Sequence, residues 1–249
     1  MGNQFFIIAT ATSLALDHGA IAVFPDLENK KAYNIPLNRE KVFSHLSAYS
    51  PRKVRSTYQE PFYHYQKIPY RPNMKIRGYF QSEKYFAHHR KEIMELFAPS
   101  SAITEYLWNH YSDLLLHSQT VSIHIRFYHE DPLQKCHLAP RRDYIEKAIS
   151  LFPEESLFVV FSNQTENAKQ LLSGIDRNFR FIEGEAHYHD FYLMSLCKDN
   201  IICNSSFSWW AAYLNPNFSK TVVAPRAWYN PAYGLNTQDL LPETWIAID

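Results

Sequence analysis

The feature that most limits how this chain can fold is an alternation, from residue 121 onward, of short apolar runs and segments with helical spacing. With short connections between them, such segments predict a parallel sheet with helices on its faces. A parallel sheet binds ligands at the carboxyl ends of its strands, where helix N-termini also point. Strands are expected at 121–127, 157–161, 179–182, 201–203 and 221–223, and helices near 141–152, 165–173, 190–198 and 207–214.

The N-terminal part of the chain is less regular. A helix is expected at 3–16, a strand at 21–24 and a helix at 83–97, with proline and tyrosine frequent before the last of these. We therefore expect two domains, an α/β domain over 1–117 and a Rossmann-like domain over 118–249.

The charge and cysteine content exclude several kinds of partner. Twenty-five basic residues balance twenty-five acidic ones, so neither nucleic acid nor an anionic membrane is expected as the main partner. The three cysteines, Cys136, Cys197 and Cys203, are odd in number and lack metal-ligand spacing. They predict reduced thiols in a cytoplasmic protein, with no disulfide and no zinc.

Membrane spans and common cofactors are not indicated either. No apolar run approaches the roughly 20 residues that a spanning helix needs, so at most a peripheral association with the inner face of the membrane is expected. The sequence holds no Asp-X-Asp pair, no Walker sequence and no Gly-X-Gly-X-X-Gly. It therefore predicts neither a metal-held nucleotide nor a dinucleotide cofactor.

The expected strand at 121–127 alternates strictly between apolar and polar residues. His124 and Arg126 therefore share one face near its carboxyl end. One interpretation is an imidazole and a cation aimed at a phosphate, because an arginine fork matches phosphate geometry. The other is a solvated edge strand, or an arginine paired with a nearby carboxylate.

A second candidate anion site follows the expected strand at 201–203. Apolar residues with the spacing of one helix face begin at Phe207, so Ser205 or Ser206 stands at the N-cap position. Free N–H groups, the helix dipole and serine hydroxyls suit a pyrophosphate there. The alternative is a well-capped helix with no ligand. Trp209 and Trp210 are expected in the core rather than under a sugar.

Two further polar residues admit both a structural and a functional interpretation. Asp190 precedes a helical pattern and is either an N-cap or an acceptor of hydrogen bonds from a base or ribose. Gly2-Asn3-Gln4 precedes an apolar helix and would form a turn that presents an amide to an interdomain cleft.

In order along the chain, these pieces resemble the alpha-1,2-fucosyltransferases of glycosyltransferase family 11, and more distantly the alpha-1,6- and protein O-fucosyltransferases. The resemblance spans nearly the whole chain, and its last segment is long and distinctive. Four segments carry it: Gly2 to Phe6, Gly78 to Phe86, His124-Ile-Arg126, and Asp190 to Leu214 with its Asn-Ser-Ser-Phe-Ser-Trp-Trp.

This resemblance implies a GT-B-like α/β fold of two Rossmann-like halves, in which the C-terminal half holds the nucleotide sugar. It implies inverting, metal-independent transfer of fucose from GDP-fucose, with no cofactor, to an oligosaccharide or glycolipid acceptor. It places His124 and Arg126 at the diphosphate and Asn3 at the fucose and acceptor side. It also implies that Asp190 contacts the guanosine. The phosphates and the neighbouring nucleoside would be contacted by Ser205, Ser206 and Phe207.

The sequence departs from the family pattern at two places. A second arginine and an aspartate usually follow the His-X-Arg strand, but here Phe127 and His129 occupy those positions, with Glu130 and Asp131 just beyond. No general base stands out among them. The family also has a leading strand before Gly-Asn-Gln, whereas this chain starts inside that motif, so either the native start lies upstream or the first strand is missing.

Three functions fit these observations. The first is a bacterial-type fucosyltransferase that decorates a cell-surface glycan. The second is a transferase for another GDP-sugar, since Phe127 and His129 alter the acceptor-facing end. The third is a degenerate protein that binds a GDP-sugar or a glycan without catalysis, because fold alone does not guarantee activity.

Overall fold

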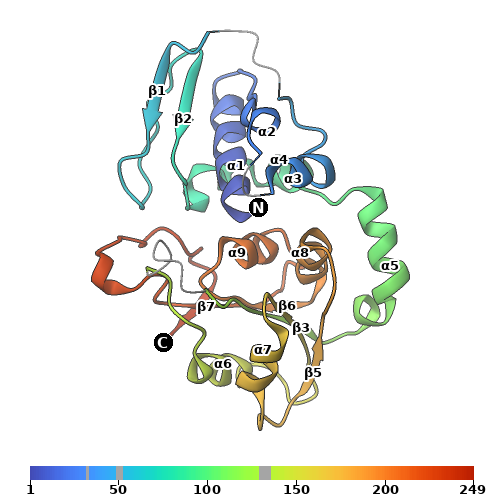
Figure 1. The fold of residues 1–249 in the computed structure, drawn as a ribbon. Coiled ribbons are helices and arrows are strands. Elements are labelled where there is room, and N and C mark those ends of the chain that lie inside the picture. The colour runs from blue at the N-terminus through green and yellow to red at the C-terminus, as the bar shows by residue number, and fades with distance from the viewer. Residues whose placement is uncertain (32–33, 49–52, 129–135) are drawn as a thin grey trace. The chain divides into compact units, whose positions relative to one another are not determined.

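The computed structural model describes Met1 to Asp249 except residues 32–33, 49–52 and 129–135 (Figure 1). The chain forms two compact units. The N-terminal unit comprises 1–100 and 236–242, and the C-terminal unit comprises 101–235 and 243–249. The division falls before helix α5 (Ser101–Leu116), whereas the sequence analysis placed it after this helix.

The N-terminal unit is mainly helical, with one two-stranded parallel sheet among its described residues. The expected strand at 21–24 is absent, and the expected helix at 83–97 is broken into two 3₁₀ turns and a short α-helix. Its elements are α1 (Gly2–Asp17), α2 (Asp26–Asn29), α3 (Ile35–Lys41), β1 (Ser56–Gln59), β2 (Met74–Arg77), η1 (Glu83–Tyr85), η2 (Ala87–His89) and α4 (Arg90–Leu96).

Aromatic packing on α1 organises this unit. The ring of Phe5 meets those of Phe43 and Phe97 edge to face, with centroids 5.1 and 4.5 Å away. Each aromatic side chain buried in this way contributes roughly 1.5–3 kcal/mol. Only glycine fits at position 78, because Glu60 packs directly against its backbone. A Cβ there would lie 2.4 Å from the Cβ of Glu60.

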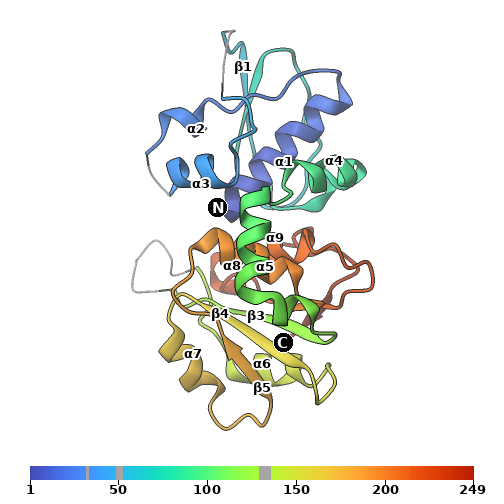
Figure 2. The same ribbon diagram turned by 90° about the vertical axis from the view of Figure 1, so that its right-hand side faces the viewer.

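The C-terminal unit is a six-stranded parallel sheet with helices on both faces (Figures 1 and 2). Parallel strands with flanking helices occur in both units, which confirms the predicted α/β class. The C-terminal unit has the expected Rossmann-like sheet, whereas the N-terminal unit has only the two-stranded sheet among its described residues. After α5, the elements of this unit are β3 (Thr120–Ile125), α6 (Arg142–Ile149), β4 (Leu157–Ser162), α7 (Thr165–Leu172), β5 (Asn178–Phe181), α8 (His187–Leu196), β6 (Asp199–Ile201), α9 (Ser206–Tyr213), β7 (Val222–Pro225), η4 (Pro231–Tyr233) and β8 (Ile246–Ile248).

The strand order β5-β4-β3-β6-β7-β8 fixes where a ligand would bind. From β3 the chain moves outward to β5, and it then returns to place β6 on the other side of β3. Because parallel crossovers are right-handed, this reversal puts α6 and α7 on one face and α8 and α9 on the other, as Figure 2 shows. The carboxyl ends of β3 and β6, on either side of this reversal, are the usual ligand position in open parallel sheets.

Strand β3 lies in the middle of the sheet, and all six of its residues are buried. The interpretation of this segment as a solvated edge strand is therefore wrong. The alternation of apolar and polar residues suggested one solvated face. In a parallel sheet, however, helices cover both faces, so the polar residues of β3 are buried as well. Trp209 and Trp210 on α9 are 0% exposed, which confirms their expected place in the core. Among the described residues, no helix is long and apolar enough to cross a membrane.

Candidate functional site

The candidate site is built where β3 and β6 end beside each other. His124 is the fifth residue of β3, and Cys203 follows β6 by two residues. The imidazole Nδ1 of His124 lies 3.2 Å from the Cys203 sulfur. Just beyond, the Tyr128 hydroxyl donates to the carbonyl of Asn204 over 2.8 Å. These two contacts join the segments after β3 and β6 into one surface at the switch point of the sheet.

Burial determines the charge states of His124 and Cys203. Desolvation, with added repulsion from Arg126, lowers the pKa of His124 to about 3, so its imidazole is neutral at physiological pH. Desolvation raises the pKa of Cys203 to about 12, so its thiol stays protonated. The neutral imidazole carries one N–H, and the tautomer in which the Cys203 thiol donates to Nδ1 has that proton on Nε2. His124 therefore offers a neutral N–H donor and is a poor proton acceptor.

Arg126 supplies positive charge at this edge. It is exposed directly after β3, and its guanidinium carbon lies 5.7 Å from the ring centre of Tyr128. No carboxylate in the described parts of the chain forms an ion pair with it. The expected alternative of a paired arginine therefore finds no support there. His129, Glu130 and Asp131, considered as candidate bases, lie outside the described residues.

The N-terminus of α9 faces the same edge. The prediction of a serine cap is confirmed at Ser205, whose Oγ accepts from the N–H of Phe207 over 3.3 Å. Ser206 is the first helical residue and is partly exposed. The ring of Phe207 packs against His124, with centroids 5.6 Å apart. Thus α9 brings serine hydroxyls and a positive dipole end beside His124.

Asp190 lies in the first turn of α8, which starts after β5. It is not an N-cap, because the cap position belongs to Ala186 and the helix has no side-chain cap bond. Its Oδ1 is buried and has no hydrogen-bond partner among the residues that the structure describes. Burial, with a contribution from the charge of Glu185, raises the pKa of Asp190 to about 7. A buried acceptor without a partner carries a desolvation penalty. A ligand that donates an N–H or O–H group to it would remove this penalty and so bind more tightly.

Neighbouring rings connect Asp190 to the rest of the site. Phe191 packs edge to face on Phe207, with centroids 5.3 Å apart. The first turns of α8 and α9 are therefore adjacent. The structure thus brings together five of the sequence-predicted residues in one unit, namely His124, Ser205, Ser206, Phe207 and Asp190, with Arg126 two residues after His124.

Asn3 belongs to the N-terminal unit. It is exposed in the first turn of α1, where its Oδ1 accepts from the side-chain amide of Gln81 over 3.0 Å. That bond links Gly2 to Phe6 with Gly78 to Phe86, two of the segments that carried the resemblance.

Glu185 forms a hydrogen-bond cluster that sequence reasoning missed. Its carboxylate accepts from the hydroxyls of Tyr106 at 3.1 Å and Tyr111 at 2.6 Å, and it lies 3.0 Å from Nδ1 of His189. Burial alone would raise the pKa of Glu185, but these bonds outweigh it and hold the pKa below its usual range. No local pattern predicts the contact, because both tyrosines precede Glu185 by more than 70 residues.

A shallow hollow opens beside Cys203 and Asn204, at the ends of β7 and β8. Its two arginines already have carboxylate partners. Arg141 pairs with Asp143, and Arg226 lies 3.4 Å from Asp249. This hollow is therefore less suited to an anion than the surface around Arg126.

Two curated Escherichia coli proteins are similar to this chain. An alpha-1,2-colitosyltransferase is 33% identical over 181 residues, which are 69% of this chain and 61% of that protein. The O-antigen biosynthesis glycosyltransferase WbnK is 35% identical over 184 residues, 68% of this chain and 59% of that protein. The chain thus spans about three fifths of the length of these relatives.

A solved structure of a mutant Arabidopsis thaliana FUT1 in complex with GDP covers 90% of this chain, and the match covers 68% of that protein, with a TM-score of 0.49 and 15% identity. The model of the family described as Glycosyl transferase family 11 matches residues 1–249. This chain belongs to glycosyl transferase family 11.

Proposed function

We propose that this chain is a glycosyltransferase that moves fucose from GDP-fucose to a hydroxyl of an acceptor glycan, with inversion, without a metal and with an alpha-1,2 linkage. One observation carries the proposal. At the switch point of the sheet, Arg126 has no carboxylate partner among the described residues, and it lies in the same unit as the capped N-terminus of α9. Cationic and dipolar groups at such an edge suit a diphosphate.

The chemistry follows from where charge develops. The bond between the fucose C1 and the diphosphate oxygen breaks, and its electron pair stays on the diphosphate. The acceptor hydroxyl oxygen forms the new bond to C1 from the opposite face, and its proton passes to a base. Arg126, Ser205, Ser206 and the N–H groups of α9 would stabilise the growing negative charge. A metal is then not required for the leaving group.

His124 and Asp190 would have separate tasks in this scheme. With Nδ1 occupied by the Cys203 thiol, Nε2 of His124 would donate a neutral hydrogen bond to the diphosphate. Asp190 would accept from the N–H groups of guanine, with Phe207 beside the nucleoside. Cys203 would act through His124, as a positioning residue that sets its tautomer.

A second donor is favoured by one relative. The E. coli protein that is 33% identical to this chain is an alpha-1,2-colitosyltransferase. Colitose is fucose without its 3-hydroxyl, so the same GDP-binding groups would serve either donor. A site that hydrogen-bonds the 3-hydroxyl would reject the deoxy sugar by up to about 10⁴-fold, whereas a purely apolar site would not.

The remaining assignments follow from the family and its O-antigen member. We infer that Asn3 lies on the fucose and acceptor side, and that the acceptor is a bacterial oligosaccharide or glycolipid of the cell surface. Transfer would then occur in the cytoplasm or at the inner face of the membrane.

The test is calorimetric titration with GDP-fucose, GDP-colitose and GDP-mannose, each with chelator present, followed by an assay of GDP release. Binding and slow GDP release with one of the first two donors support a transferase and identify its sugar. Binding without release supports a non-catalytic relative. Binding that requires an added divalent metal, or binding to none of the three, would overturn the proposal.

A further inference from the structure

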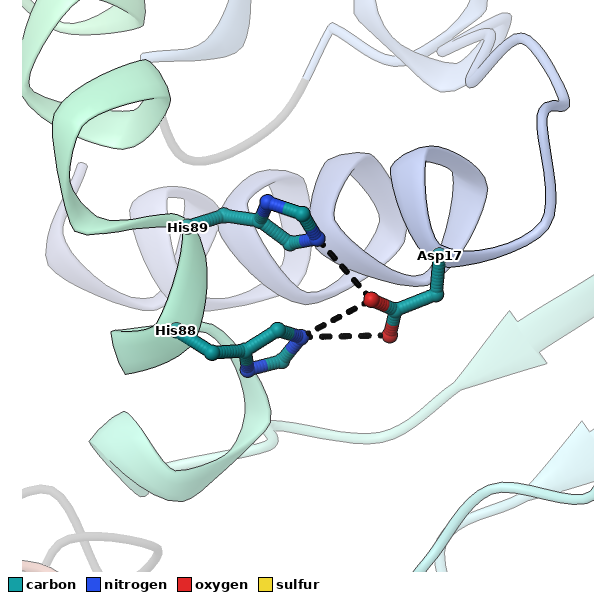
Figure 3. Close-up of side chains that lie close together, drawn as sticks. All are labelled: Asp17, His88 and His89. Atoms are coloured by element: carbon teal, nitrogen blue, oxygen red, sulfur yellow. Dashed lines mark hydrogen bonds and ion pairs between the residues drawn. The ribbon is translucent and has the colours of Figure 1, made fainter.

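We propose that Asp17, His88 and His89 form a binding site for a divalent transition cation of the Zn²⁺ class. Asp17 is the last residue of α1, and the two histidines lie at the end of η2. Figure 3 shows both imidazole rings pointing toward the carboxylate of Asp17. No other group of three or more possible ligands gathers in this way among the residues that the structure describes.

The distances between donor atoms fit such a cation. Nε2 of His88 lies 3.0 and 3.2 Å from the two carboxylate oxygens of Asp17, and Nε2 of His89 lies 2.9 Å from one of them. Tetrahedral bonds of about 2.0–2.1 Å place neighbouring donors about 3.3 Å apart. The carboxylate of Asp17 would therefore move away from each imidazole nitrogen by only a few tenths of an ångström to admit the ion, and the three ligand atoms already lie within 4.8 Å of one another.

The backbone explains how two adjacent histidines can serve one ion. Successive residues of a regular α-helix do not face each other. Here η2 ends at His89, which has a non-helical φ of −110° and ψ of 33°, and the two imidazole rings approach to 4.5 Å. The adjacent pair therefore has none of the spacing of a helical metal motif, and the sequence alone does not reveal it.

The surroundings leave the three side chains open to an ion, which would replace a contact of 3.2 Å between Nε2 of His88 and Oγ of Ser13. Asp17, His88 and His89 keep 38%, 48% and 22% of their side-chain surface exposed, so an ion can enter from solvent and retain a water. The other ring nitrogen of His89 lies 4.0 Å from a carboxylate oxygen of Glu92. At this distance Glu92 forms no hydrogen bond with the ring, so it favours a bound cation only through its charge.

Two imidazoles and one carboxylate select the kind of metal. Imidazole suits Zn²⁺, Ni²⁺ and Co²⁺, whereas Mg²⁺ prefers oxygen ligands. The site lies about 21 Å along α1 from Asn3, at the other end of the helix. The ion would therefore brace α1 against the 3₁₀ segment, and it takes no part in the proposed transfer.

The test is titration of the full chain with Zn²⁺, Co²⁺ and Mg²⁺. We expect one equivalent of Zn²⁺ or Co²⁺ to bind, visible absorption bands of nitrogen-coordinated Co²⁺, and no competition from Mg²⁺. Saturating Zn²⁺ is expected to raise the thermal midpoint by about 5 °C or more. Absence of saturable binding below millimolar Zn²⁺, or equal binding of Mg²⁺, would overturn the site.

Three variants make this test specific. Asp17→Asn keeps a hydrogen-bond acceptor for an imidazole N–H but is a poor ligand, so it should lose binding at least tenfold. His88→Ala should do the same. His45→Ala removes another exposed histidine of the same unit and should bind as the unchanged protein does. Equal losses in all three variants, or full binding by Asp17→Asn, would refute the proposal.

Discussion

Glu185 and Asp190 lie five residues apart in the C-terminal unit, yet their carboxylates have opposite environments. Glu185 accepts hydrogen bonds from two tyrosines and contacts His189, and these bonds keep its pKa low. Asp190 has a buried oxygen with no hydrogen-bond partner in the described parts of the chain, and burial raises its pKa to about 7. The fold already satisfies the first carboxylate, whereas a ligand that donates hydrogen bonds would satisfy Oδ1 of the second.

The same contrast separates two arginines of this unit. Arg180 pairs with Asp113 and lies near the ring of Tyr111, while Arg126 has no carboxylate partner in the described chain. Buried polar groups are usually paired in folded proteins, so an unpaired one such as Oδ1 of Asp190 marks a place where a ligand contributes most. Arg126 is exposed, and without a carboxylate beside it its charge is available to an anion. Both unpaired groups belong to the candidate site.

The largest expected effect is on Arg126. Arg126→Ala should lower the rate of GDP release or transfer by about 100- to 1000-fold, because a donor to the leaving group is lost. Arg180→Ala should leave the rate within a few fold and lower only the thermal midpoint. Turnover by both variants and far-ultraviolet circular dichroism decide the matter. Full activity of Arg126→Ala would remove the leaving-group role.

Exchanging the two carboxylates for amides tests the comparison directly. Asp190→Asn should weaken GDP binding by about 10- to 100-fold, the loss of a charge-assisted hydrogen bond, without lowering stability. Glu185→Gln should bind GDP within a few fold of normal and lose about 1.5–3 kcal/mol of stability. Calorimetry and urea unfolding separate the outcomes. Equal effects of both changes on GDP binding would show that Asp190 and Glu185 do not differ as ligand-binding and structural carboxylates.

The pH dependence of binding sharpens the assignment of Asp190. Its carboxyl must be ionised to accept from guanine, and with a pKa of about 7 it is largely protonated at pH 6. GDP affinity should therefore fall about tenfold between pH 8 and pH 6. Asp190→Asn should remove this dependence. If the unchanged protein binds GDP as tightly at pH 6 as at pH 8, ionised Asp190 is not the acceptor for guanine.

The stability of the ligand-free protein should change with pH in the opposite direction. The folded pKa of Asp190 is raised above its unfolded value near 3.8, so the folded state binds more protons between about pH 4 and 7. The contribution of Asp190 to stability is therefore lost as pH rises through this window. The thermal midpoint of Asp190→Asn, relative to the unchanged protein, should be higher at pH 8 than at pH 5.

Regular patterns made much of the C-terminal unit predictable. Alternating apolar runs located β3 to β7, and a serine before a helical pattern located the cap at Ser205, because these signals act within a few residues. The local pattern of β3 could not reveal that it is central, since its burial depends on β4 and β6. The Glu185 cluster and the meeting of Asp17 with His88 were equally hidden, because each joins segments about 70 or more residues apart.

The smallest expected effect concerns Ser205, which is both a cap and a proposed phosphate contact. Ser205→Ala should cost about 1 kcal/mol of stability, because the N–H of Phe207 loses its acceptor, whereas Ser205→Gly should cost only a few tenths. If the hydroxyl also binds phosphate, both variants should weaken GDP binding by about fivefold or more. Normal GDP affinity in Ser205→Gly would leave Ser205 as a cap alone and assign the anion to the backbone of α9 and Arg126.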